Sequence, residues 1–179
     1  MPGRSVTEPD GVTRITSRER PAEIVRGSFS LRRSFDASPR EVYSAFADPD
    51  RRTAWFRIPG TSEHRLDFRV GGGETVEATT SVTGRTERIE YRSRFIDIAP
   101  DERIVYQCES RIDDRLHAIS LVSVELTRKT VGTGLLYTDQ YALYVYVDGA
   151  DRATTIAHHE GSLPLVLNGL AGALRRHRI

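Results

Sequence analysis

The sequence predicts an α+β fold, in which a curved antiparallel β-sheet of about six or seven strands wraps around one long C-terminal helix. Two short helices are expected after the first strand. Segments with alternating apolar residues follow one another between residues 65 and 146, separated by turn residues and without helical periodicity, which is typical of an antiparallel meander. A helical leucine pattern then occupies 163–174. Packing that helix on one face of the sheet buries both apolar surfaces together.

Local signals predict the first strand and the two short helices. Alternating apolar residues over 27–36 indicate a strand. Ser38 is a favourable N-cap, Pro39 suits the first helical turn, and Glu41 completes a capping box. The helix that begins there should end at the next Asp-Pro pair, and a second short helix should cover 51–55.

The strands of the meander are delimited by turn residues such as the glycines at 71–73 and the Thr-Gly pair at 83–84. Because each segment carries apolar residues at alternate positions, each should bury one face. We expect these strands at 65–70, 74–82, 87–98, 103–112, 116–126 and 135–146.

The long C-terminal helix is predicted from four leucines at helical spacing: Leu163, Leu167, Leu170 and Leu174. A start at Ser162 would place Pro164 in the first turn, where proline is tolerated. A start near Arg152 would place the same proline inside the helix.

Length, charge and cysteine content bound the class of protein. The 179 residues suit one domain at 26–179, after a flexible lead-in at 1–25 that holds at most a short edge strand at 12–15. Lys and Arg total 26 against 25 Asp and Glu, a net charge of +1, which argues against a dedicated nucleic-acid binder. There is no apolar run of membrane-spanning length, no apolar signal segment and only one cysteine. We expect a cytoplasmic protein without nucleic-acid or membrane partners.

Five segments carry a family resemblance through their order and spacing. They are FDASPREVYSAFADPDRRTAWF from Phe35 to Phe56, FRVGG from Phe68 to Gly72, ERIVY from Glu102 to Tyr106, YTDQYALY from Tyr137 to Tyr144 and HEGSLPLVLNGLAGAL from His159 to Leu174. Over roughly residues 26–176 the chain resembles the START-like (SRPBCC) superfamily, which has the helix-grip fold of the birch pollen allergen. It is most similar to the homologues of the activator of the heat-shock chaperone ATPase (Aha-type), a family also described as polyketide-cyclase-like.

The resemblance implies a cavity between sheet and helix that commonly holds an apolar or amphipathic small molecule, but it implies no shared catalytic set. Three positions depart from the family pattern. Asp139 occupies a position where family members usually have Glu, and Tyr141 one where they usually have Gly. Family members also usually have an aromatic residue near the position of Ser162, which this chain lacks. These departures should reshape the pocket, so the ligand cannot be transferred by analogy.

The aromatic residues give the most informative candidate site. Period-two alternation places Tyr137, Asp139 and Tyr141 on one face of the last strand. A carboxylate between two phenols could orient a polar ligand group, or Asp139 and Tyr137 could act as catalytic acid and base. Alternatively, this face is exposed or the tyrosines fill the core. The expected cavity residues, with Trp55 near the mouth, are Trp55, Phe68, Tyr91, Tyr106, Tyr137, Asp139, Tyr141, Leu163, Leu167 and Leu170.

Other chemistry-bearing residues favour structural interpretations. Adjacent helical residues point in different directions, so His158 and His159 beside Glu160 predict a solvated helix start rather than a metal site. Cys108 alternates with apolar residues, which favours a buried small side chain over a nucleophile. The glycines at 71–73 lead into a strand, which favours a hairpin or bulge over a phosphate loop.

The remaining basic residues favour exposed positions. His64 and His117 are expected to be structural or solvent-exposed. The arginine pairs at 32–33 and 51–52 and the basic tail at 175–178 lie near acidic residues, so we expect solvated faces rather than an anion-binding surface.

These observations support three functional hypotheses. The first is a protein that binds a small apolar or amphipathic molecule in the sheet–helix cavity. The second is a cyclase- or hydrolase-like enzyme that uses Asp139 and a cavity tyrosine, and the third is a module that contacts a chaperone. No cofactor or metal is implied, and a homodimer could form through an exposed strand edge.

Overall fold

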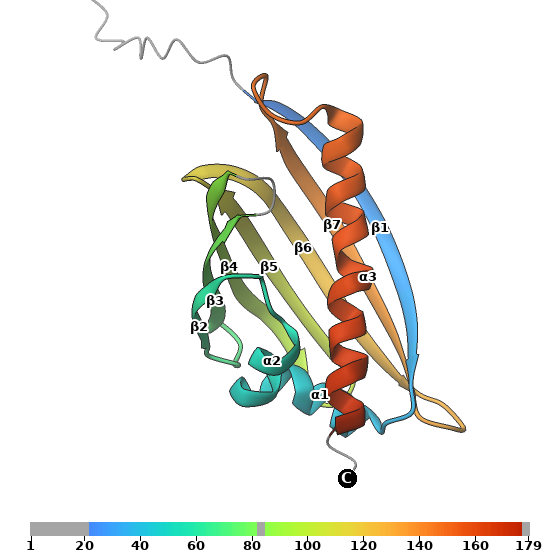
Figure 1. Cartoon of the computed structure of the whole chain (residues 1–179). Helices are drawn as coiled ribbons and strands as arrows, with labels where there is room; N and C mark the ends of the chain where they lie inside the picture. Colours follow the sequence, from blue (N-terminus) through green and yellow to red (C-terminus); the bar gives the residue numbers. More distant parts are fainter. Residues whose placement is uncertain (1–21, 82–84, 177–179) are drawn as a thin grey trace, which may run out of the picture.

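The computed structural model describes residues 22–81 and 85–176. Its helices and strands follow the predicted order (Figure 1). They are β1 (Glu23–Phe35), α1 (Pro39–Ala47), α2 (Pro49–Trp55), β2 (Thr61–Leu66), β3 (Gly73–Ser81), β4 (Thr86–Ala99), β5 (Arg103–Ile112), β6 (Arg115–Arg128), β7 (Thr133–Val145) and α3 (Arg152–Arg176).

The seven strands form one antiparallel sheet in the order β1-β7-β6-β5-β4-β3-β2. The sheet curves around α3, which lies along β7 and β1, while α1 and α2 pack beneath its C-terminal half (Figure 1). The predicted fold class is therefore confirmed. No helix in the described part of the chain is long and apolar enough to cross a membrane.

The helix starts agree with the sequence signals. The Ser38 hydroxyl accepts a hydrogen bond from the Glu41 amide at 3.3 Å, and the Glu41 carboxylate accepts one from the Ser38 amide at 2.7 Å. This is the predicted capping box. Asp48 caps α2 by accepting a hydrogen bond from the Arg51 amide at 2.9 Å, so α2 begins directly after α1 ends.

Two boundaries of the sheet differ from prediction. The prediction of a strand at 65–70 is wrong, because β2 ends at Leu66 and the chain then turns. In this turn Gly71 has a φ of +83° and donates its amide hydrogen to the Phe95 carbonyl. At the other edge of the sheet, β1 begins at Glu23 rather than at 27, since pairing with β7 continues to that residue.

The helix α3 begins near Arg152, the earlier of the two predicted starts, and Pro164 lies inside it. Asp151 accepts a hydrogen bond from the Thr154 amide at 2.9 Å and so satisfies one of the first free amide groups. The predicted edge strand at 12–15 and the turn at 83–84 lie outside the described residues.

The main core lies between the concave face of the sheet and the helices. Leucines of α3 belong to this core together with alternate residues of the sheet and side chains of α1 and α2. Leu167, Leu170, Val122 and Val124 are at most 1% exposed. Burying one such side chain contributes about 1.5–3 kcal/mol, so this layer fixes α3 against the sheet.

Candidate functional site

The strand register gathers polar side chains into one row across the concave face of the sheet. Read from β3 to β7, the paired residues of this polar row are Glu74, Ser93, Cys108, Ser120 and Tyr141. The next row begins with apolar and aromatic residues and ends in a carboxylate: Phe95, Tyr106, Val122 and Asp139. Because paired residues point to the same side of a sheet, both rows face the helix layer.

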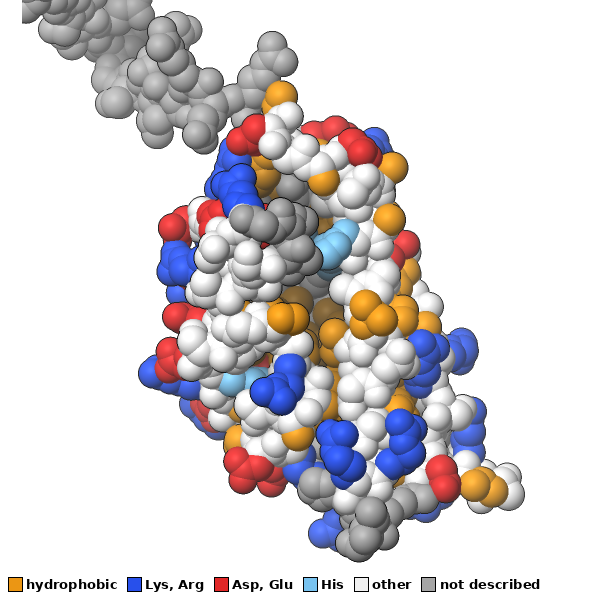
Figure 2. All heavy atoms as spheres, in the orientation of Figure 1, with side chains coloured by type: hydrophobic (Ala, Val, Ile, Leu, Met, Phe, Trp, Pro, Cys, Tyr) orange, Lys and Arg blue, Asp and Glu red, His pale blue; other side chains and the backbone are white. Residues whose placement is uncertain are grey.

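The middle of the polar row is not fully covered. Ser93 and Cys108 are only half-buried although they lie on the concave face. The reason is that α3 packs against β1 and β7, at one side of the sheet, rather than against β4 and β5. Figure 2 shows the surface hollowed between α3 and the β2–β4 side, with hydrophobic side chains at the bottom. We call this feature the central hollow.

Asp139 on β7 lies beside the polar row and beneath α3. It is 5% exposed, and its Oδ2 accepts a hydrogen bond from Nε2 of His159 at 3.0 Å. A carboxylate only accepts hydrogen bonds, so His159 must donate from this nitrogen. The other oxygen, Oδ1, is buried and has no hydrogen-bond partner among the described residues.

Tyr141, two residues further along β7, makes a second contact with α3. Its hydroxyl donates to Oε1 of Glu160 at 2.7 Å, and its ring lies 4.7 Å from the His159 ring, centroid to centroid. Burial and the nearby Glu160 carboxylate raise the pKa of Tyr141 to about 12, so the phenol keeps its proton. The ring lies over Gly27, where a Cβ atom would overlap it.

The other predicted tyrosines, Tyr91, Tyr106 and Tyr137, lie on β4, β5 and β7. The hydroxyls of Tyr106 and Tyr137 share a hydrogen bond of 3.2 Å, so Tyr137 points to a tyrosine and not to Asp139. Burial raises the pKa values of both phenols and of Tyr91. Burial also raises the pKa of Cys108 to about 12, with a further increase from Asp139. A neutral thiol is a poor nucleophile, which supports the structural interpretation of this cysteine.

A second charged cluster lies at the β2–β3 side of the concave face. Arg52 is 5% exposed and pairs with Glu74 through two hydrogen bonds of 2.8 Å. Nε2 of His64 contacts Oε1 of the same carboxylate at 2.7 Å. The guanidinium lies over the ring of Phe56 at 4.0 Å and over that of Trp55 at 4.4 Å. The prediction of a solvated face at 51–52 is therefore wrong for Arg52.

The remaining predicted cavity residues belong to the packing around the hollow. Trp55 was expected near the mouth, but it is 5% exposed in the core and donates its indole N–H to the Ala45 carbonyl at 2.7 Å. Phe68 lies in the turn after β2 and packs on the ring of Phe95 at 4.8 Å. The α3 leucines of the predicted set, Leu163, Leu167 and Leu170, are buried against the sheet.

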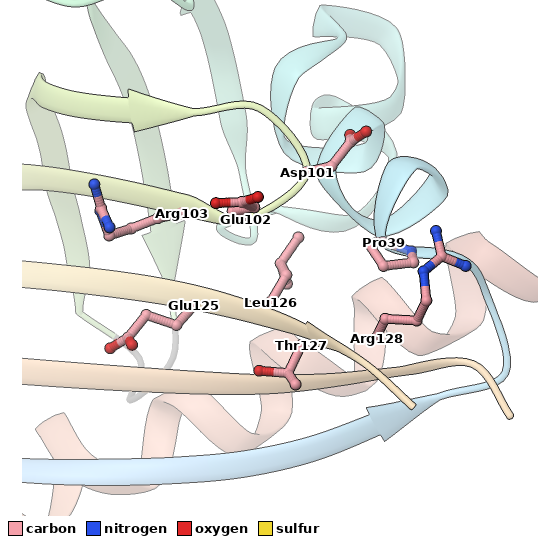
Figure 3. A pocket seen from close by; sticks show the side chains of 8 residues that line it. All are labelled: Pro39, Asp101, Glu102, Arg103, Glu125, Leu126, Thr127 and Arg128. Carbon is pink, nitrogen blue, oxygen red and sulfur yellow. The ribbon is translucent and has the colours of Figure 1, made fainter. Parts of the chain in front are cut away.

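Two separate depressions lie at the ends of the sheet. One, of about 290 Å³, is lined by His117 and by Thr155, which lies one helical turn before His159. Burial and the two histidines of α3 lower the pKa of His117. The other, of about 570 Å³, lies where β5 begins and β6 ends, and mostly charged side chains surround it (Figure 3). No predicted cavity residue lines this larger depression.

His159 and Glu160 are site residues whose contacts with β7 the sequence does not predict. The start of α3 was expected to be solvated, but the His159 side chain is only 16% exposed because it turns toward Asp139. The sequence signal for this orientation is that His159 precedes Leu163 by four residues, which places it on the same face of the helix as the buried leucines. Within 22–81 and 85–176, no three His, Cys, Asp or Glu side chains gather so that they could hold a metal ion.

A sheet curved around one long helix, with a polar row and a hollow beneath that helix, is the helix-grip architecture of START-like proteins. The chain belongs to the family described as Activator of Hsp90 ATPase homolog 1-like protein, whose sequence pattern matches residues 36–175. Proteins with this fold commonly bind ligands or act as activators. No curated protein matches the sequence.

Solved structures share this fold. A protein from Rhizobium loti is 35% identical, with a TM-score of 0.69, and the match covers 84% of this chain and 99% of that one. A putative uncharacterized protein from Rhizobium leguminosarum is 24% identical, with a TM-score of 0.75 over 86% of this chain and 97% of the other. A conserved protein from Geobacillus kaustophilus is 12% identical, with a TM-score of 0.68, and the match covers 85% of this chain and 96% of that one. This likeness concerns the fold alone.

Proposed function

We propose that this protein binds one small, largely apolar molecule in the central hollow. The observation that carries the proposal is Asp139, a carboxylate 5% exposed whose Oδ1 has no partner among the described residues. Buried polar atoms are nearly always hydrogen-bonded, and leaving one unsatisfied costs about 1–3 kcal/mol. A polar group of a bound molecule would supply the missing hydrogen bond.

The surroundings of Asp139 support a ligand that is mostly apolar. Ligand sites typically combine apolar walls with a few placed polar groups. Here the side chains of Phe95 and Val122 lie in the same row as the carboxylate, and the half-buried Cys108 lies in the row beside it. Ligand binding is favoured over a chaperone-contacting role because Oδ1 of Asp139, the buried acceptor without a partner among the described residues, lies beneath α3. A partner protein would contact the outer surface instead.

Fluorescence of N-phenylnaphthylamine, which brightens in an apolar environment, tests the proposal. The wild-type protein should bind this neutral probe saturably. Cys108→Leu should weaken binding by about tenfold, because the larger side chain occupies the hollow. Gln107→Leu introduces the same leucine side chain on the opposite, exposed face of the same strand and should leave binding unchanged.

The folded state of both variants is checked by circular dichroism and by the midpoint of urea unfolding. An absence of saturable binding to the wild type would contradict the proposed function. Equal binding by two folded variants would place the probe outside the central hollow and contradict it as well.

A further inference from the structure

We propose that the central hollow selects amphipathic molecules whose polar head donates hydrogen bonds, such as alcohols and alkylammonium ions, and rejects those with a carboxylate head. This inference rests on the proposed function and specifies its ligand class. It follows from the hydrogen-bonding capacity and the charge of the groups at the α3–β7 side of the hollow.

The first argument is the direction of the missing hydrogen bond. Oδ1 of Asp139 can only accept, and Oδ2 is already occupied by Nε2 of His159. The head of the ligand must therefore provide an N–H or O–H group. A carboxylate head would bring only acceptors and would leave Oδ1 unsatisfied.

The second argument is the charge around this atom. Asp139 and Glu160 are both acidic; the basic side chain of His159 contacts Asp139, and Glu160 is contacted by the Tyr141 hydroxyl. Tyr141 already donates its hydroxyl hydrogen to Glu160, so that proton is not available to an anionic head. An anion would meet like charge in a partly dehydrated site, which is strongly unfavourable.

The third argument is that Arg52, which is the buried arginine among the described residues, cannot compensate. Arg52 is already engaged by Glu74 through both Nε and Nη2, and it lies at the β2–β3 side of the sheet. Withdrawing it toward an anionic ligand would leave the buried Glu74 without its main partner, which is costly. The geometry thus favours a cationic or neutral donor near Asp139.

Displacement of N-phenylnaphthylamine at neutral pH by octanol, octylammonium and octanoate tests this selectivity. The three molecules share one alkyl chain and differ in their heads. For the wild type, octanol and octylammonium should displace the probe at concentrations about tenfold lower than octanoate.

Asp139→Asn tests whether the preference for donor heads comes from Asp139 or from differences in hydration among the three heads. The asparagine amide is uncharged and can donate as well as accept, so it should not discriminate against a carboxylate. The preference over octanoate should shrink to about threefold or less in this variant. Asp50→Asn removes the same charge from an exposed position of α2 and should keep the wild-type preference. If Asp139→Asn does not fold, Glu160→Gln is used instead, and octanoate alone should gain affinity.

Two outcomes overturn the inference while leaving the proposed function standing. One is displacement by octanoate at the same or lower concentration than octanol in the wild type. The other is probe binding that none of the three molecules displaces. Failure of the probe itself to bind would instead count against the proposed function.

Discussion

Glu74 and Asp139 are both buried carboxylates on the concave face of one sheet, but their surroundings differ. Glu74 is 1% exposed and is held by Arg52 and His64, which contact both of its oxygens. Asp139 is 5% exposed, but within the described part of the chain only its Oδ2 has a hydrogen-bond partner. The first arrangement is complete within the chain and stabilises the fold, whereas the second leaves the acceptor that the proposed ligand would use.

The largest expected effect comes from breaking the complete cluster. Glu74→Gln should lower the free energy of unfolding by about 3–5 kcal/mol, because it leaves the buried charge of Arg52 without a counter-ion. Asp139→Asn should cost about 1 kcal/mol or less, since the amide oxygen can still accept from His159. Urea unfolding followed by tryptophan fluorescence measures both values.

Glu77→Gln is the matched control, because Glu77 lies on the same strand but on the exposed face. Its change should stay within about 0.5 kcal/mol. Equal losses for Glu74→Gln and Glu77→Gln would contradict the stabilising role assigned to the Arg52 cluster.

The pH dependence of stability should sharpen the same comparison. Arg52 and His64 lower the pKa of Glu74 from 4.5 to about 2. A carboxyl with a lowered pKa in the folded state binds fewer protons than it does when unfolded, so its contribution is complete above pH 4.5 and is lost as the pH falls toward about 2.

The difference in stability between the wild type and Glu74→Gln should therefore shrink across this pH range and stay constant above it. Urea unfolding at a series of pH values from neutral to acidic measures that difference. A difference that does not change with pH would contradict the ionic role of Glu74.

A smaller effect is expected at the edge of the Asp139 region. In Gly27→Ala the added Cβ overlaps the ring of Tyr141, which must then move away from Glu160. The free energy of unfolding should fall by about 1–3 kcal/mol. Gly161→Ala lies in α3, where a Cβ meets no atom within 4 Å, and should instead raise stability by about 0.5–1 kcal/mol. Thermal unfolding distinguishes the two signs, and a gain in Gly27→Ala would contradict the described contact.

Much of the fold could be predicted from sequence because its signals are local. The capping box at Ser38 and the helical leucines identify helices by short-range chemistry, and the alternating strands identify the meander. The exception, at 65–70, has the same alternation as a strand. There the apolar side chain of Phe68 packs on Phe95 from a turn, which alternation alone cannot distinguish from a strand.

The candidate site was only partly predictable, because its contacts join distant segments. The face shared by Asp139 and Tyr141 follows from alternation within one strand. Their hydrogen-bond partners lie on α3, and which residues of α3 can reach them depends on how that helix packs over the sheet. The sequence of two adjacent histidines, His158 and His159, does not show which of them faces the sheet. Arg52 was missed for a similar reason, since its partner Glu74 lies 22 residues away.

The pairing of β1 with β7 also determines when the site can form during synthesis. Among the described strands β1 is made first, but its neighbour β7 is made last; Ser30 and Thr138, which share a hydrogen bond, are 108 residues apart. Asp139 lies on that late strand, and His159 lies on the helix that follows it. Contacts so distant in sequence make folding slow, and until they form β1 presents an unpaired edge on which chains can associate. The contact between Asp139 and His159 can therefore form only after both β7 and α3 have been translated.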